Sequence, residues 1–123
     1  MPRTLHPDAA WAAIGALYAD PALQRTLLQR QDDEGLDVVL HLFAHWATTQ
    51  GHPLDDAALA EARTLVAPWR NEVIAPLRAL RRSMKPIAAG AARIEAVRDQ
   101  VKAAELAAER AQVHMLCDWL QAR

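Results

Sequence analysis

Residues 68–85, PWRNEVIAPLRALRRSMK, combine an apolar helical stripe with a dense row of cations. Val73, Leu77, Leu80 and Met84 recur at spacings of four, three and four, which places them on one face of a helix. The cations of the stretch are Arg70, Arg78, Arg81, Arg82 and Lys85. At about 100° per residue they fall within an arc of roughly 120°. The pattern predicts a helix that packs along one face and presents cations to water or to an anion along another.

Two prolines divide this region. Proline lacks a backbone N–H and crowds the preceding turn of a helix, so Pro68 predicts a break near Val66 or Ala67. Pro76 lies inside an otherwise strong helical pattern. We therefore expect a kinked helix over about 68–85 that lacks the hydrogen bond from residue 76 to residue 72.

Helix start and stop signals are clear along the rest of the chain, and strand signals are nearly absent. Asp20 before Pro21 is typical of an N-cap followed by the first helical residue, and Gly35 is a typical stop. Asp37 can cap a helix that is apolar most of the way round, which suggests a central position. The predicted helices cover about residues 8–18, 21–33, 37–50, 55–67, 68–85 and 91–120. We predict a single all-α domain over 1–123, a bundle of five or six helices, whose C-terminal helix closes the bundle or projects from it.

Composition limits the class of protein. The 123 residues are 52% hydrophobic and 24% charged, which fits one folded domain. The single Cys117 excludes an internal disulfide and a cysteine-based zinc cluster, and predicts a reducing, cytoplasmic compartment. No apolar run reaches the roughly 20 residues that span a bilayer. Residues 1–20 lack the pattern of a signal peptide and are expected to belong to the mature fold.

Charge is distributed unevenly. Residues 1–62 carry nine acids against three cations, a net charge of −6, and residues 63–123 carry eleven cations against six acids, a net charge of +5. We expect the two halves to pair inside the fold, with acids such as Asp32, Asp55 and Asp56 meeting the cationic row. A nucleic-acid partner is not expected, because the chain as a whole is not basic. The alternative is that the row binds an external anion, since guanidinium groups match oxyanions in pairs of hydrogen bonds.

The C-terminal helix has two apolar features. A narrow stripe follows a near-heptad spacing through Ile94, Val97, Val101, Ala104, Ala108, Ala111 and Met115. Such a stripe packs within the chain or pairs with a second copy, as coiled-coil seams do, which makes a homodimer through this helix a candidate. A second set is a candidate apolar surface and comprises Val113, Leu116, Trp119 and Leu120. An exposed patch of this kind would indicate a partner.

Two further constellations suggest chemistry. Asp37, His41 and His45 follow one helix face, and two histidines four residues apart can share a metal ion. Asp37 and His45 are about 12 Å apart along the axis, too far to bind the same ion, and Asp37 also serves as an N-cap. The four tryptophans are Trp11, Trp46, Trp69 and Trp119. They either fill the core or line a pocket for an apolar ligand.

Four segments resemble a family of short bacterial proteins catalogued as a domain of unknown function, and together they span residues 16–110. The segments are ALYADPALQRTLLQRQD (16–32), LDVVLHLFAHW (36–46), APWRNEVIAPLRALRRSMK (67–85) and VKAAELAAER (101–110). The family pattern more often has Asn at the position of Val39 and does not include His41 or His45. The resemblance implies an all-α bacterial cytoplasmic protein and brings no established activity, cofactor or catalytic residue.

The sequence therefore favours a non-enzymatic interaction or regulatory module that binds a macromolecular partner, expected to be a protein. No catalytic residue is assigned and no cofactor is expected, because the chain lacks phosphate-binding loops and nucleophile motifs. The first alternative is a carrier or sensor of a small apolar or anionic ligand in a tryptophan-lined pocket. The second is a metal-dependent enzyme that uses Asp37, His41 and His45.

Overall fold

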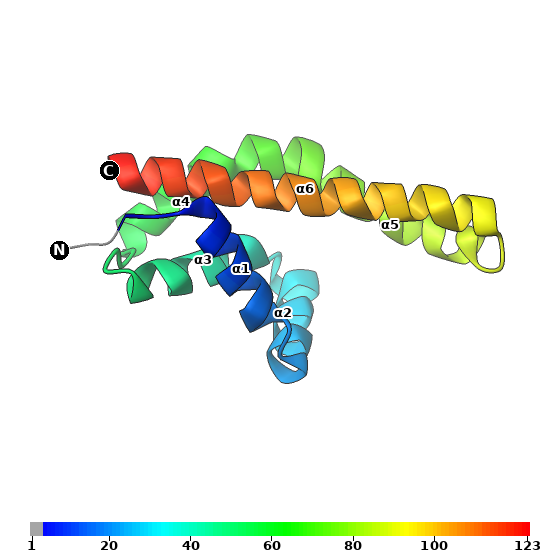
Figure 1. Ribbon diagram of the computed structural model, residues 1–123, viewed down its shortest axis with the longest axis horizontal. Helices are drawn as coiled ribbons and strands as arrows, with labels where there is room; N and C mark the ends of the chain where they lie inside the picture. The colour runs from blue at the N-terminus through cyan, green and yellow to red at the C-terminus, as the bar shows by residue number, and fades with distance from the viewer. Residues whose placement is uncertain (1–3) are drawn as a thin grey trace. The chain divides into compact units, whose positions relative to one another are not determined.

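A computed structural model describes residues 4–123, and this part of the chain contains six α-helices, one π-helical segment and no strand (Figure 1). The elements are α1 (Pro7–Tyr18), α2 (Pro21–Glu34), α3 (Val38–Thr49), α4 (Asp56–Trp69), η1 (Arg70–Ile74), α5 (Ala75–Ala88) and α6 (Ala92–Ala122). The all-α fold predicted from the sequence is confirmed. None of the helices in residues 4–123 is long and apolar enough to cross a membrane.

The predicted helix signals act as expected at the ends of α2 and at the start of α3. The carboxylate of Asp20 accepts a hydrogen bond of 2.9 Å from the Ala22 N–H, and Pro21 begins the helix. Gly35 ends α2 with φ at 66°, a left-handed conformation that a Cβ atom disfavours. Asp37 caps α3 by accepting from the Leu40 N–H at 3.1 Å.

The described residues form two compact units, and the single domain expected over 1–123 stays a prediction. Unit 1 comprises residues 4–65 and 113–123, and unit 2 comprises residues 66–112. The boundaries fall inside α4 and inside α6, so each of these helices contributes to both units.

Helix α3 supplies much of the core of unit 1, where it packs against α1 and α2. Half of its residues are buried: Val38, Leu40, Leu42, Phe43, Trp46 and Ala47. The rings of Phe43 and Trp46 lie 6.0 Å apart, within the range of a favourable aromatic contact. The prediction that this apolar helix is central holds within its unit.

Unit 2 consists mainly of η1, α5 and most of α6, and the break predicted at Pro68 is wrong. Helix α4 continues through Pro68 to Trp69, so there is no break at residues 66–67. The irregularity is the π-helical segment that follows, in which the Ala75 N–H bonds to the Arg70 carbonyl five residues earlier. This wider turn brings Pro76 to the first turn of α5, where its missing N–H costs little. Helix α5 also runs through Pro86, and the chain turns at residues 89–91.

Candidate functional site

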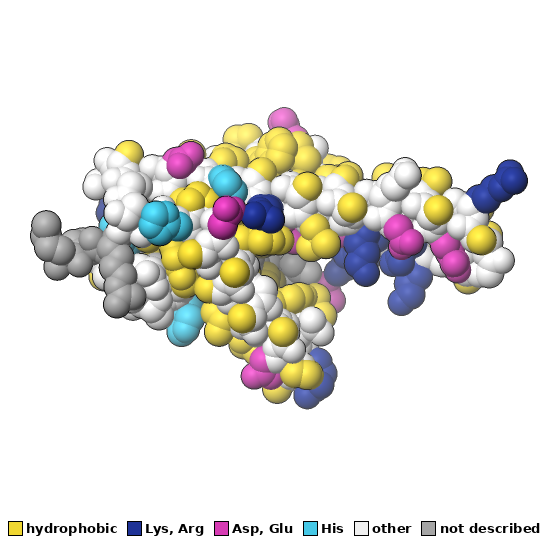
Figure 2. All heavy atoms as spheres, viewed as in Figure 1, with side chains coloured by type: hydrophobic (Ala, Val, Ile, Leu, Met, Phe, Trp, Pro, Cys, Tyr) yellow, Lys and Arg dark blue, Asp and Glu magenta, His cyan; other side chains and the backbone are white. Residues whose placement is uncertain are grey.

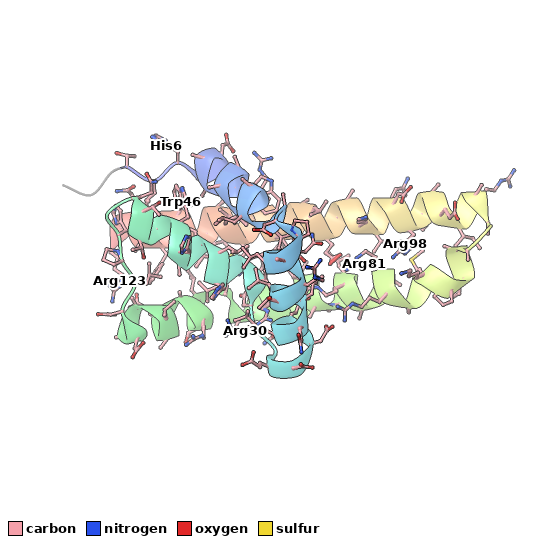
Figure 3. All side chains as sticks on the ribbon, turned by 90° about the horizontal axis from the view of Figure 1, so that it is seen from below. His6, Arg30, Trp46, Arg81, Arg98 and Arg123 are labelled. Atoms are coloured by element: carbon pink, nitrogen blue, oxygen red, sulfur yellow. The ribbon has the colours of Figure 1, made fainter. Side chains whose placement is uncertain are left out.

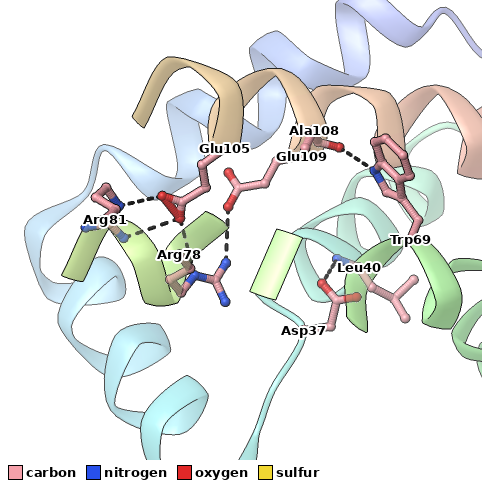
Figure 4. A network of polar contacts seen from close by, with 8 residues as sticks. All are labelled: Asp37, Leu40, Trp69, Arg78, Arg81, Glu105, Ala108 and Glu109. Carbon is pink, nitrogen blue, oxygen red and sulfur yellow. Dashed lines mark hydrogen bonds and ion pairs between the residues drawn. The ribbon is translucent and has the colours of Figure 1, made fainter. Parts of the chain in front are cut away.

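Two arginines of the predicted cationic row are engaged with acids inside unit 2 (Figure 4). Arg78 lies 3.4 Å from Glu105 through Nε and 3.1 Å from Glu109 through Nη2. Arg81 donates to both carboxylate oxygens of Glu105, from Nε to Oε1 and from Nη2 to Oε2 at 3.3 Å. Both acids lie on α6, in the C-terminal half of the chain. For Arg78, the expected pairing with the acid-rich residues 1–62 is therefore wrong. Arg81 has a further interaction partner besides Glu105, and for it the expectation stays a prediction.

This ion-pair network is largely removed from water. Glu105 is 6% exposed, and the side chains of Arg78 and Arg81 are 17% and 23% exposed. Burial raises the pKa of Glu109 above its ordinary value, although the Arg78 guanidinium pulls that pKa down. Two cations face two carboxylates, so the network has no net charge to offer to an external anion. Its effect is to fix α5 beside α6.

The other three cations of the row differ in their surroundings. Arg70 and Arg82 also have interaction partners, and Lys85 is exposed near the end of α5. Two further contacts join the helices of unit 2. Arg98 donates from Nε to the Arg81 carbonyl at 3.1 Å, and the Trp69 indole donates to the Ala108 carbonyl at 2.9 Å. Figure 3 shows Arg81 and Arg98 at the boundary between α5 and α6.

Apolar residues of α5 and α6 follow a heptad spacing, and we call this set of residues the seam. Its members are Leu77, Leu80, Met84 and Ile87 of α5 with Ile94, Val97, Val101 and Ala104 of α6. Four of them remain far more exposed than a packed coiled-coil core allows: Leu80 48%, Ile87 64%, Ile94 37% and Val97 50%. Figure 2 shows hydrophobic atoms interspersed with Lys and Arg along the α5 and α6 part of the surface. The heptad spacing is visible in the sequence, but the sequence does not show that four of these residues are exposed.

The C-terminal apolar surface predicted from the sequence is absent for three of its four residues. Val113 and Leu116 are 0% exposed and Leu120 is 6% exposed, while Trp119 is partly buried. Polar contacts within unit 1 fix this end of α6. The Trp119 indole donates to Glu61 at 2.8 Å, and the Leu5 N–H donates to the side-chain oxygen of Gln121 at 2.7 Å.

The predicted histidine site lines a hollow in unit 1 of about 320 Å³ between α3 and α4. The lining residues are Leu36, Asp37, Leu40, His41, Ala44, His45, Thr48, Leu54, Leu59 and Arg63. His41 and His45 are exposed along its wall, and partial burial lowers the pKa of His41, with Arg30 and His45 lowering it further. Within residues 4–123 no three His, Cys, Asp or Glu side chains are placed to hold a metal ion. Asp37 caps α3 through its carboxylate, which accepts from the Leu40 N–H.

The tryptophans do not line this hollow. Trp46 is a core residue of α3, and Trp11 is half-buried on α1. Trp69 and Trp119 each use the indole N–H in a contact that joins two helices. These positions favour a packing role over a ligand pocket.

Comparisons with known proteins place the chain in a family without assigning an activity. No curated protein and no solved structure matches the sequence. A family model described as "Protein of unknown function (DUF2390)" matches residues 9–116, which cover all of unit 2 and most of unit 1. The chain therefore belongs to the DUF2390 family of proteins of unknown function.

Proposed function

We propose that the protein is a non-enzymatic interaction module, and that the seam of unit 2 is the surface that binds a protein partner. The observation that carries the proposal is the exposure of Leu80, Ile87, Ile94 and Val97 on two adjacent helices. Single exposed apolar residues are ordinary on a protein surface, but a set that follows one structural pattern is typical of an interaction site.

The neutral ion-pair network supports this reading. Arg78 and Arg81 are held by Glu105 and Glu109, which stabilises the two helices beside each other. A partner would thus meet a preformed surface and lose little conformational entropy in ordering it. The network itself offers no nucleophile and no open metal position, which favours binding over catalysis.

We also propose that the protein works in the bacterial cytoplasm. Cys117 is a buried free thiol, which suits a reducing compartment. The bacterial assignment rests on the family resemblance.

Affinity capture with three tagged baits tests the proposed function. The baits are the unaltered chain, the Ile87→Ser/Val97→Ser variant and the Leu106→Ser variant. Leu106 is the matched control because it is 49% exposed, as much as Val97, but lies on the outer side of α6 away from the seam. We expect one protein to be captured by the unaltered chain and by Leu106→Ser, and to be lost from Ile87→Ser/Val97→Ser. Equal recovery from all three baits, or no specific protein from any, contradicts the proposal.

A further inference from the structure

We infer that the hollow between α3 and α4 binds a compact carboxylic acid, whose carboxylate meets the Arg63 guanidinium and whose apolar part lies against leucine side chains. All of the lining residues belong to unit 1, so this site is separate from the seam of unit 2 and does not depend on the proposed function. Three features support it: the size of the hollow, the apolar side chains inside it, and the polar groups on its wall.

Two helices and the segments before them form the hollow. The α3 residues in its wall share one helix face, at positions 40, 41, 44, 45 and 48. Leu59 and Arg63 are one turn apart on α4, and Leu36 and Leu54 come from the segments that precede α3 and α4. The hollow measures about 320 Å³, at the lower end of the range of small-molecule sites. This volume suits a compact molecule with one ring or a short chain.

The inner part of the hollow is apolar. Leu40 is 3% exposed, and the half-buried apolar residues around it are Leu36, Ala44, Leu54 and Leu59. An apolar group placed against these side chains removes both surfaces from water, which favours binding. Four leucines around one hollow therefore favour a ligand with an apolar part.

Arg63 brings an unmatched charge to the wall of the hollow. Its side chain is exposed and forms no ion pair or hydrogen bond with any residue of 4–123. In this it differs from Arg78 and Arg81, whose guanidinium groups are held by acids. A guanidinium group of this kind can bind a carboxylate through two parallel N–H···O bonds.

Two histidines place further hydrogen-bonding groups on the same wall. His41 and His45 are exposed, and neither imidazole is hydrogen-bonded within the described residues. Burial lowers the pKa of His41, and Arg30 and then His45 lower that pKa further. The charged neighbours that act on this imidazole are thus cations, and a ligand anion beside it meets favourable surroundings.

Asp37 is the one acid among the described residues of the lining, and it limits the charge of the ligand. Its carboxylate caps α3 by accepting from the Leu40 N–H (Figure 4), at the helix end where the dipole offsets a negative charge. Asp37 repels a doubly charged group more strongly than a singly charged one. A carboxylate therefore suits the hollow better than a phosphate monoester does.

Protein NMR with three defined probes tests the inference. The probe is hydrocinnamate, the matched neutral probe is hydrocinnamide, and the doubly charged probe is phenyl phosphate. Each is titrated at neutral pH into the isotope-labelled full chain, and the amide signals of Leu54 and Leu59 and the ring signals of His41 and His45 are followed. We expect saturable shifts at these residues with hydrocinnamate. Its affinity should be at least about fivefold higher than that of hydrocinnamide, as expected for a charge pair at an exposed site.

Variants test the charge and the volume separately. Arg63→Gln should remove the preference for hydrocinnamate over hydrocinnamide. The matched control Arg25→Gln changes an exposed arginine of α2 that does not line the hollow, and it should keep the preference. Ala44→Leu places a larger side chain in the hollow and should weaken both probes at least about fivefold. The amide spectrum of each variant checks the fold, and Arg63 is exposed enough that its replacement leaves the helices intact.

Each contrary result overturns the inference. Without saturable shifts at the hollow, there is no site for a compact acid. Equal affinity for hydrocinnamate and hydrocinnamide, or a preference that survives Arg63→Gln, removes the role of Arg63. Binding that Ala44→Leu leaves unchanged places the ligand elsewhere. Tighter binding of phenyl phosphate than of hydrocinnamate assigns the hollow to a phosphate monoester.

Discussion

Replacing Glu105 by Gln should destabilise unit 2 much more than the loss of an ordinary surface ion pair. The Glu105 carboxylate accepts from Arg81 through two nitrogens and lies 3.4 Å from Arg78. It is 6% exposed, so its loss leaves two guanidinium groups in a site with little water. Gln keeps the shape and one acceptor oxygen but removes the charge.

The size of the effect follows from burial. Removing one partner of a fully buried ion pair costs about 3–5 kcal/mol. The side chains of Arg78 and Arg81 are 17% and 23% exposed, and Arg78 keeps its ion pair with Glu109. The cost of losing the Glu105 charge should therefore be lower than for a fully buried pair. We expect the free energy of unfolding to fall by about 2–3 kcal/mol, which corresponds to about one lost hydrogen bond to a charged group.

Urea denaturation followed by far-UV circular dichroism measures this change. The control is Glu34→Gln, which breaks the exposed pair between Arg30 and Glu34 on α2. That pair has side chains 43% and 58% exposed, and its loss should cost about 0.3–0.5 kcal/mol. Replacing Glu105 and Arg81 together by Met should cost less than Glu105→Gln alone, because the Arg81 guanidinium is then not left buried without the Glu105 carboxylate. If Glu105→Gln costs no more than Glu34→Gln, the network does not hold α5 against α6.

Three further predictions concern single residues. Gly35→Ala should destabilise the protein by about 1 kcal/mol, because Gly35 has φ at 66°. Gly15→Ala should stabilise it by about 0.5–1 kcal/mol, because Gly15 lies inside α1 with open space at the Cβ position. Shifts of the urea midpoint in the same direction for both variants would contradict this. The raised pKa of Glu109 means that the folded state binds its proton more tightly, so its contribution to stability is present below the ordinary pKa of 4.5 and is lost as pH rises through the folded pKa. The stability of the unaltered chain relative to Glu109→Gln should therefore be greater at pH 4 than at pH 7, and a difference that grows with pH would refute the sign. Burial, with Asp118 adding to it, raises the pKa of Cys117 to about 11, so a thiol reagent at pH 8 should label the native chain far more slowly than the urea-unfolded chain; equal rates would show that the thiol is accessible.

Local signals in the sequence predict most of the fold. Asp20, Gly35 and Asp37 each act through atoms within a few residues, so their roles are visible in the sequence alone. Pro68 misleads because helix α4 continues through it to Trp69, and the irregular backbone lies instead in the π-helical segment directly before Pro76. Such a segment depends on packing around the backbone, which a propensity argument does not include.

The candidate site was only partly predictable. The cations and the heptad spacing are present in the sequence, but the acids that bind Arg78 and Arg81 are set by the pairing of α5 with α6. Charge totals for the two halves of the chain point to acids of residues 1–62, whereas Arg78 binds two acids of α6, because ion pairs depend on neighbours in space. Leu116 looked like a surface residue for a similar reason: its cover comes from elements distant in sequence.

The central proposal is that the seam, and not the outer side of α6, contacts a partner protein. A photo-reactive amino acid placed at position 97 or at position 106 in the native host tests this directly, since both sites are about half exposed. We predict that irradiation links position 97, but not position 106, to one protein. No adduct at position 97, or the same adducts at both positions, would contradict the account.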